Sequence, residues 1–284
     1  RMAEGYFEWT DSMTPGTDGD GRPFIGVDNL ANYFVAMNHA MGSDIYHYDE
    51  SGTMVPDLDK GIIERLFLNY YEPFTKGYYG AKGRYRSDDV KQSYLAGCIG
   101  SSSSVLYFPE EVADSQGNMV PVTTGVYQYP VMEGTTPTAI QQGAGVAVFN
   151  RSDEENRAAL DFIHWLTIDK GFELATSMSY MPVDNNGMTE EQEQQIDDAR
   201  VLKGIETGLK QSNSYQMVYG FDFENSYDVR TGVDACFSEA LSQGGLEFEE
   251  YLARGMSMDE AAASMDYGSK AEAFYEQVKT IFEE

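Results

Sequence analysis

The fold is decided by the stretch GAGVAVFNRSDEENRAALDFIHWLTIDKGFELATSMSYMPV, residues 143–183. It opens with a continuous apolar run over 143–150, which is typical of a strand buried on both faces. Ser152 and Glu155 then have the spacing of a capping box, which predicts the start of a helix. The apolar residues that follow recur at helical spacing: Ala159, Phe162, Ile163 and Leu166, with Trp165 beside them. We therefore predict a buried strand and an amphipathic helix ending near residue 170, with Trp165 in the core.

Working outward, the same signals predict further helices on both sides. Asn29 is placed to cap a helix over 29–41, and another helix is predicted over 59–71. Ser87 is predicted to cap a third helix. Two more capping boxes have the pairs Thr189 with Gln192 and Ser257 with Glu260. The last helical stripes are carried by Val229, Val233, Phe237 and Leu241, and by Phe274, Val278, Ile281 and Phe282.

Strand signals are fewer and shorter. Residues 46–57 alternate around a Ser-Gly turn and predict a hairpin, and residues 125–132 predict a strand ending near a proline. Helices therefore dominate, with short strands between them. The pattern predicts an α/β fold that is rich in helix.

Charge excludes two classes of partner. The chain of 284 residues has 19 basic and 47 acidic residues, a formal net charge of -28. Nucleic acid is excluded because a chain without a basic face cannot displace the counterions of phosphates, and an anionic membrane surface would repel it. No segment approaches the roughly 18 apolar residues of a membrane-spanning helix, so direct membrane insertion is not expected. The N-terminal RMAEGYFEWTDS has no apolar run of a signal peptide.

The residue pattern does not favour an enzyme or a metal site. The three histidines (His39, His47 and His164) are not spaced as metal ligands, and no nucleophile elbow, phosphate-binding loop or dinucleotide fingerprint is present. A glycosidase would need two carboxylates facing across a cleft, and Asp228 and Asp234 are the only acids flanking an apolar stripe that invite this reading. A solvated helix face is the favoured interpretation of both. We expect no cofactor, no catalytic residue and no metal. Cys98 and Cys236 favour two buried free thiols, with a disulfide left open.

Two stretches resemble the extracellular solute-binding proteins of ABC importers, of the maltose-, multiple-sugar- and glycerol-phosphate-binding type. In residues 143–183 the matching positions are Ala158, Ala159, Phe162, Leu166, Gly171, Pro182 and Val183. The second stretch is NSYDVRTGVDACFSEALSQGG at 225–245, followed by SMDEAAASM at 257–265. Weaker likenesses lie at 26–42 and 94–104, where the family's usual Lys-Ala-Met residues are replaced around Gly97 and Cys98. The order of these motifs along the chain carries the resemblance.

The resemblance implies a periplasmic-binding-protein type II fold that is incomplete. Residues 1–137 would be the first segment of the C-terminal lobe, 138–187 a returning segment of the N-terminal lobe, and 188–284 the second segment of the C-terminal lobe. It further implies a solute-binding component that holds a carbohydrate, preferably an oligosaccharide, in a cleft between lobes and delivers it to permease subunits. The expected location is extracellular or periplasmic, with a lipid anchor preceding this chain.

The residues expected to contact solute lie on the matched loops. They are Asp28, Asn29, Asn32, Ser101, Ser102, Ser103, Gln142, Gly143, Asn225, Tyr227 and Arg230. Tyr227 is expected to stack on a sugar ring and Arg230 to donate hydrogen bonds. Plain helix capping by Asn29, a flexible serine loop and an acid partner for Arg230 remain open as structural alternatives. Two other functional classes also remain open: a glycan-active enzyme or carbohydrate-binding module, and a surface interaction domain without a small ligand.

Overall fold

The computed structural model describes residues 1–17, 19–113, 116–182 and 188–283. Its α-helices are α1 (Met2–Asp11), α2 (Leu30–Ala40), α3 (Lys60–Thr75), α4 (Arg86–Lys91), α5 (Asp153–His164), α6 (Gly171–Ser177), α7 (Glu190–Glu193), α8 (Ala199–Ser214), α9 (Ser226–Ala253), α10 (Met258–Ser264) and α11 (Tyr267–Glu283). A 3-10 helix η1 (Ser102–Tyr107) and a π-helix η2 (Trp165–Asp169) complete the helical part. The strands are β1 (Ile25–Val27), β2 (Ile45–Tyr48), β3 (Met54–Asp57), β4 (Gly97–Ile99), β5 (Glu111–Ala113), β6 (Met119–Pro121), β7 (Thr138–Ile140) and β8 (Gln216–Val218). The predicted helix-rich α/β class is confirmed.

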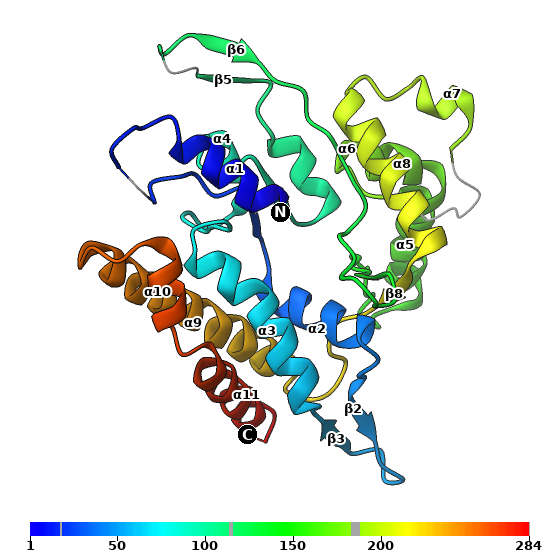
Figure 1. The fold of residues 1–284 in the computed structure, drawn as a ribbon. Helices are drawn as coiled ribbons and strands as arrows, with labels where there is room; N and C mark the ends of the chain where they lie inside the picture. Colours follow the sequence, from blue (N-terminus) through cyan, green and yellow to red (C-terminus); the bar gives the residue numbers. More distant parts are fainter. Residues whose placement is uncertain (18, 114–115, 183–187, 284) are drawn as a thin grey trace.

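The core lies where α2, α3, α9 and α11 pack together, at the lower part of Figure 1. Phe67 of α3 stacks on Phe274 of α11 with ring centroids 4.3 Å apart, and Phe237 of α9 packs edge-on to Phe274 at 4.8 Å. All three side chains are buried. The apolar stripes predicted for α9 and α11 therefore face each other, because each helix can bury its stripe only against another.

Local capping signals account for most helix starts. Asn29 accepts a hydrogen bond from the Asn32 backbone, and Asp59 accepts one from Ile62. All three predicted capping boxes are present, at the starts of α5, α7 and α10. The prediction for Ser87 is wrong: α4 begins at Arg86 and Ser87 is buried inside it, because the Arg86 backbone N–H is held by Asp28 from a distant segment.

The strands form four two-stranded ladders. The predicted hairpin is confirmed as the antiparallel pair β2–β3, and β5–β6 is also antiparallel. The pairs β1–β4 and β7–β8 are parallel, with Val27 opposite Ile99 and Ile140 opposite Val218. Parallel pairing aligns their carboxyl ends, which therefore open on the same side of each ladder.

Two strand predictions are wrong. Residues 125–132 and 143–150, all within the described ranges, form no strand. The side chains of the second stretch are exposed, including Phe149, which is 83% exposed. A doubly buried strand needs sheet neighbours on both edges and cover on both faces, and the described part of the chain supplies neither.

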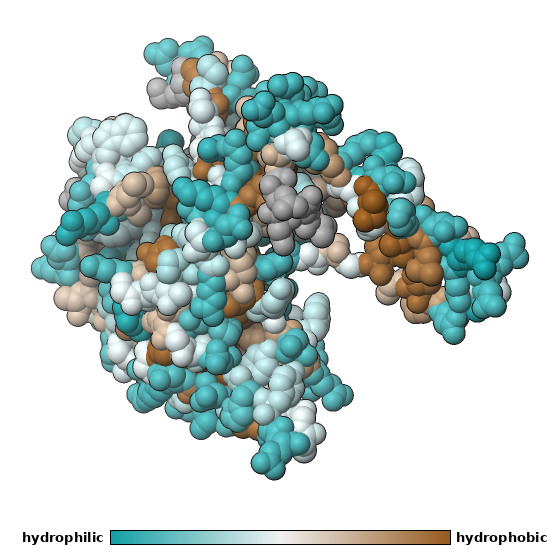
Figure 2. Space-filling view, turned by 90° about the vertical axis from the view of Figure 1, so that its right-hand side faces the viewer, coloured by the Kyte–Doolittle hydropathy of each residue, from teal (hydrophilic) through white to brown (hydrophobic). Residues whose placement is uncertain are grey.

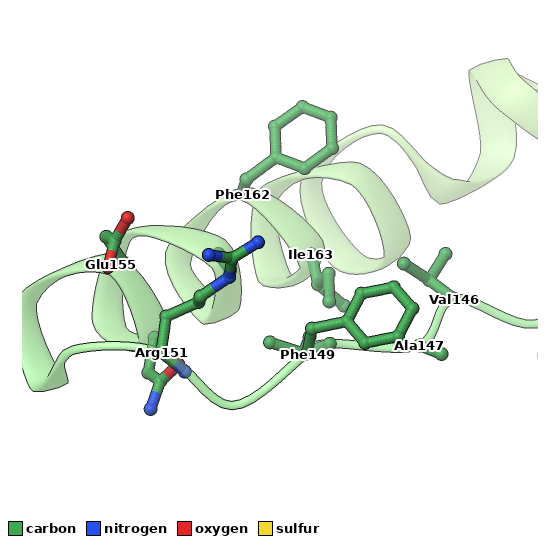
Figure 3. A pocket seen from close by; sticks show the side chains of 10 residues that line it. Val146, Ala147, Phe149, Arg151, Glu155, Phe162 and Ile163 are labelled. Carbon is green, nitrogen blue, oxygen red and sulfur yellow. The ribbon is translucent and has the colours of Figure 1, made fainter.

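The helical segment after this stretch is also unburied on its apolar side. Trp165 is 46% exposed and Phe162 is 56% exposed, so the prediction that Trp165 lies in the core is wrong. The closest packing of α5 is against η2, which follows it in the chain. We call the apolar surface formed by 146–149 and by Ala159, Phe162 and Ile163 the α5 shelf; Figure 3 shows 146–149 running alongside α5, and Figure 2 shows a hydrophobic area on an arm standing away from the body.

The chain segments contribute unequally to the core. Its buried residues come from 27–71 and 218–282, and the described part of the segment 138–187 adds only a partly buried Ile140 to that cluster. Val183, part of the motif that carries the resemblance, lies outside the described residues. Within the described ranges, no helix is both long and apolar enough to cross a membrane.

Candidate functional site

Most of the predicted solute-contacting residues lie in loops after the strands of the two parallel pairs, whereas Asn32 lies on α2 and Tyr227 and Arg230 lie on α9. Asp28 and Asn29 follow β1, and Ser101–Ser103 follow β4. Gln142 and Gly143 follow β7, and the segment 219–225 follows β8. Loops at the carboxyl ends of parallel strands are where open α/β sheets bind ligands. Four loops that contain predicted residues therefore follow strands of the two parallel pairs.

The first turns of α2 and α9 meet at a polar contact. Arg230 Nη2 on α9 donates to Asn32 Oδ1 on α2 at 3.1 Å. From the next turn of α9, Asp234 Oδ1 accepts from the Leu30 and Ala31 backbone N–H groups at 2.9 and 3.2 Å. We call this group, Asn29, Asn32, Arg230 and Asp234, the α2–α9 junction. It joins residues about two hundred positions apart into one polar surface.

The contacts at the α2–α9 junction decide between the alternatives stated for Asn29 and for Arg230. Asn29 does cap α2, since its side-chain oxygen accepts from Asn32 N at 2.7 Å. Arg230 has no carboxylate within ion-pair distance among the described residues. A guanidinium has several donors in a fixed fork, and the contact with Asn32 uses one of them. The half-buried Arg230 therefore keeps donors for another acceptor.

Asp234 corrects one expectation. A solvated helix face was favoured for both Asp228 and Asp234, and Asp228 is indeed exposed. Asp234 is half-buried, and its carboxylate accepts from the two backbone N–H groups of α2 that the Asn29 side chain does not reach. A carboxylate at a helix N-terminus is stabilised by the partial positive charge there, so its role is to lock α2 onto α9. Sequence reasoning missed this contact; the only available signal was its spacing of one turn from Arg230.

Asp28 holds a third segment close to the junction. Its Oδ1 accepts from the Arg86 backbone N–H at 2.7 Å. The Arg86 guanidinium forms a buried ion pair with Asp89 at 3.0 Å, and Asp89 also accepts from the Gly83 backbone N–H at 2.7 Å. Asp28 thus acts in this structure as an anchor for α4. Arg86 and Asp89 were not singled out in the sequence, although Arg-x-x-Asp in 86–89 was a visible ion-pair spacing.

The serine loop approaches Asp28 through a glycine. A Cβ at Gly100 would lie 2.7 Å from Asp28 Oδ2, so only glycine fits at this close approach. Ser101 and Ser103 share a hydrogen bond of 3.0 Å between their hydroxyls. The Ser102 hydroxyl donates to the Ser179 carbonyl at 3.0 Å. The loop leads into η1, and its hydroxyls bond both within the loop and to Ser179 of a distant segment, while Ser101 is exposed.

The remaining predicted residues are exposed. Tyr227 is 76% exposed on the first turn of α9, and Asn225 precedes it in a left-handed conformation with φ of 65°. Gln142 and Gly143 are exposed and lie outside regular structure. Tyr219, directly after β8, is 67% exposed and was not predicted. Its position next to a strand end was the signal that could have identified it.

Of the two thiols, Cys98 lies close to Asp28, whose negative charge adds to the burial that raises its pKa. Both cysteines are free, as favoured. Burial raises the pKa of Cys98 to about 12 and the pKa of Cys236 to about 11, so neither is a reactive thiolate at neutral pH.

The described residues contain no group of three or more His, Cys, Asp or Glu that could hold a metal. Two cavities of about 320 and 370 Å³ are present, and neither is lined by a predicted solute-contacting residue.

Comparison with known proteins identifies no relative: no family model, no curated protein and no solved structure matches the chain.

Proposed function

We propose that this chain is the greater part of an extracellular solute-binding protein of an ABC importer, with a periplasmic-binding-protein type II fold. It would bind a carbohydrate, preferably a neutral oligosaccharide, between two lobes and present it to permease subunits. Such a protein releases its ligand unchanged, so the proposal requires no catalytic group and no cofactor. The ordered motifs at 143–183 and 225–265 motivate it.

The observation that carries the proposal is the state of Arg230. This guanidinium is half-buried, is oriented by Asn32 at 3.1 Å, and has no acid partner among the described residues. A sugar offers many neutral oxygens, which are acceptors for the unused donors. An exposed tyrosine nearby in the chain, Tyr227, adds an aromatic face against which sugar C–H groups can pack.

The α5 shelf supports the two-lobe arrangement. Val146, Phe149 and Phe162 are 60%, 83% and 56% exposed, and they lie on one segment of the chain. In Figure 3 the Ile163 side chain points from α5 toward the extended segment that contains Phe149. Contiguous apolar surface of this kind usually marks a place where another protein surface packs. In the proposed fold the first lobe covers the shelf, and residues 143–150 become a strand of its sheet.

A thermal-shift screen tests the proposal. The natural full-length gene product would be screened against neutral oligosaccharides, glycerol phosphodiesters and polyamines. A ligand that binds only the folded state raises the melting temperature, and a concentration 100 times Kd adds about 2.7 kcal/mol. We expect at least one oligosaccharide to do so, and Arg230→Gln to weaken its binding at least tenfold.

The matched control is Arg254→Gln. Arg254 is the C-cap residue of α9, at the opposite end of the helix from Arg230. It is exposed and forms an ion pair with Glu250 at 3.1 Å. It removes the same charge without touching the proposed site, so solute affinity should be unchanged. The proposal fails if no solute in the screen raises the melting temperature, or if Arg230→Gln and Arg254→Gln bind equally well.

A further inference from the structure

A second cavity lies away from the α2–α9 junction. It has a volume of about 370 Å³, is open to solvent, and is lined by residues of α1 and the loop after it, the end of α3, Tyr94, and the second half of α9. Its size is at the small end of the range for small-molecule pockets, about 300 to 1,000 Å³. None of its lining residues belongs to the set expected to contact solute.

One wall of the cavity contains a glycine that no close packing contact requires. α9 contains the pair Gly244 and Gly245, and a glycine inside a helix costs about 1 kcal/mol relative to alanine. Packing explains Gly244, since a Cβ there would collide with the buried Tyr71 side chain. No such contact explains Gly245: its Cβ would meet only Phe74 Cε1, at an ordinary 3.8 Å. The effect of Gly245 is to leave the cavity open.

The walls combine aromatic rings with unused hydroxyls. Phe7, Phe74, Tyr79 and Tyr94 all line the cavity. Tyr79 and Tyr94 are half-buried, and among the described residues neither hydroxyl makes a hydrogen bond within the protein or is a buried atom without a partner. Burial raises the pKa of both phenols, so both remain neutral donors and acceptors. They are available to a bound molecule.

Charge around the cavity is balanced. Lys76 and Glu249 are both lining residues, and they offer one cationic donor and one anionic acceptor. Glu249 is close enough to contribute to the raised pKa of Tyr94. A charged ligand would gain from one of these groups and lose from the other, whereas a neutral polyol can donate to one and accept from the other.

We propose that this cavity binds a small neutral polyhydroxylated ring of the monosaccharide class. The ring's C–H face would pack on the aromatic walls, and its hydroxyls would bond to the two tyrosines, Lys76 and Glu249. This site is separate from the α2–α9 junction and does not depend on the function proposed above.

Titration calorimetry and ligand-observed NMR with glucose, galactose, mannose and inositol test the proposal on the 284-residue chain. We expect saturable binding of at least one of them at millimolar concentration. Gly245→Leu places a side chain in the open space and should weaken that binding at least tenfold. Tyr94→Phe keeps the ring, removes the hydroxyl and should weaken it severalfold, which keeps the test informative if Gly245→Leu does not fold.

Arg230→Gln separates this site from the junction. Binding that survives Arg230→Gln and is lost in Gly245→Leu supports the cavity. The proposal is overturned if none of the four probes binds, if binding is unchanged in both cavity variants, or if binding is lost only in Arg230→Gln.

Discussion

Arg230 of α9 donates a hydrogen bond of 3.1 Å to the side chain of Asn32 on α2, joining the first turns of two helices that lie far apart in the sequence. One turn further along α9, Asp234 accepts from the α2 backbone. The two contacts fix the angle and register at which the helices meet. The polar surface at this point is therefore a product of both helices and exists in neither alone.

Asp234→Ala should destabilise the protein. Two backbone N–H groups at the start of α2 lose their acceptor, and loss of such a cap costs about 1 to 2 kcal/mol. Urea denaturation followed by circular dichroism measures the change. Asp228→Ala is the control, because Asp228 is an exposed acid on the same helix. Its cost should stay below that of Asp234→Ala; equal costs would show that the contact with α2 contributes nothing.

The neighbouring glycines of α9 should respond oppositely to alanine. Gly244→Ala forces a methyl group into the buried Tyr71 side chain and should cost about 1 to 3 kcal/mol. Gly245→Ala meets only Phe74 at 3.8 Å and should stabilise by up to about 1 kcal/mol through helix propensity. Thermal denaturation of the two variants gives the comparison. Loss of stability in both would contradict the open space at Gly245.

The acid limb of the stability curve should depend on Asp198. Its side-chain hydrogen bonds with Arg200 lower the pKa of Asp198 below its ordinary value of 3.8. The unfolded state then binds more protons in this region, so the stabilisation is present above pH 3.8 and disappears as pH falls through the folded-state pKa. Asp198→Asn keeps the oxygen that accepts from the Arg200 backbone at 2.8 Å. We expect its stability to fall less steeply than wild type below pH 4 or so in urea melts, and parallel profiles would refute the role of the charge.

Both thiols should be protected in the folded protein. Burial raises the pKa of Cys98 to about 12 and of Cys236 to about 11. At pH 8 the thiolate population of each falls more than roughly a hundredfold below that of an unfolded cysteine. Ellman's reagent should therefore react slowly with the native protein and rapidly with both cysteines in denaturant. Cys98→Ser and Cys236→Ser assign each phase, and a fast native phase would contradict the burial.

Aromatic side chains of equal size should differ in energetic importance. Phe237 is fully buried between α3 and α11, so Phe237→Ala should cost about 3 to 5 kcal/mol. Phe162 is 56% exposed on the α5 shelf, and Phe162→Ala should cost less than about 1 kcal/mol in the 284-residue chain. Chemical denaturation gives both values. A cost for Phe162→Ala close to that of Phe237→Ala would show that the shelf is covered in solution.

Helix starts were predictable from the sequence because capping is local. Asn29, Asp59 and the three capping boxes each act within one turn of the chain. Ser87 shows the limit of this reasoning, since a distant carboxylate, Asp28, holds the N–H of Arg86 and moves the start. A side chain supplied from elsewhere in the chain leaves no local signal.

Strands were less predictable because a strand is defined by its neighbour. Residues 143–150 have the composition of a buried strand but no partner among the described residues, and they are exposed coil. Conversely, β1 and β4 have only three residues each. They pair although they lie far apart in the sequence, with Ile25 opposite Gly97, and no local pattern indicates this pairing. Periodicity reports which faces are apolar and not what will cover them.

By itself, the sequence determined the helix-rich class, the capped helix starts and the apolar stripes of α9 and α11, because these depend on residues a few positions apart. Only the tertiary structure decided that Arg230 would meet Asn32 and find no acid partner among the described residues, that Asp234 would hold α2, and that the α5 shelf would stay open. Those outcomes depend on which surfaces contact each other in space. Burial and hydrogen-bond pairing require two segments in contact, so neither segment's sequence determines them alone.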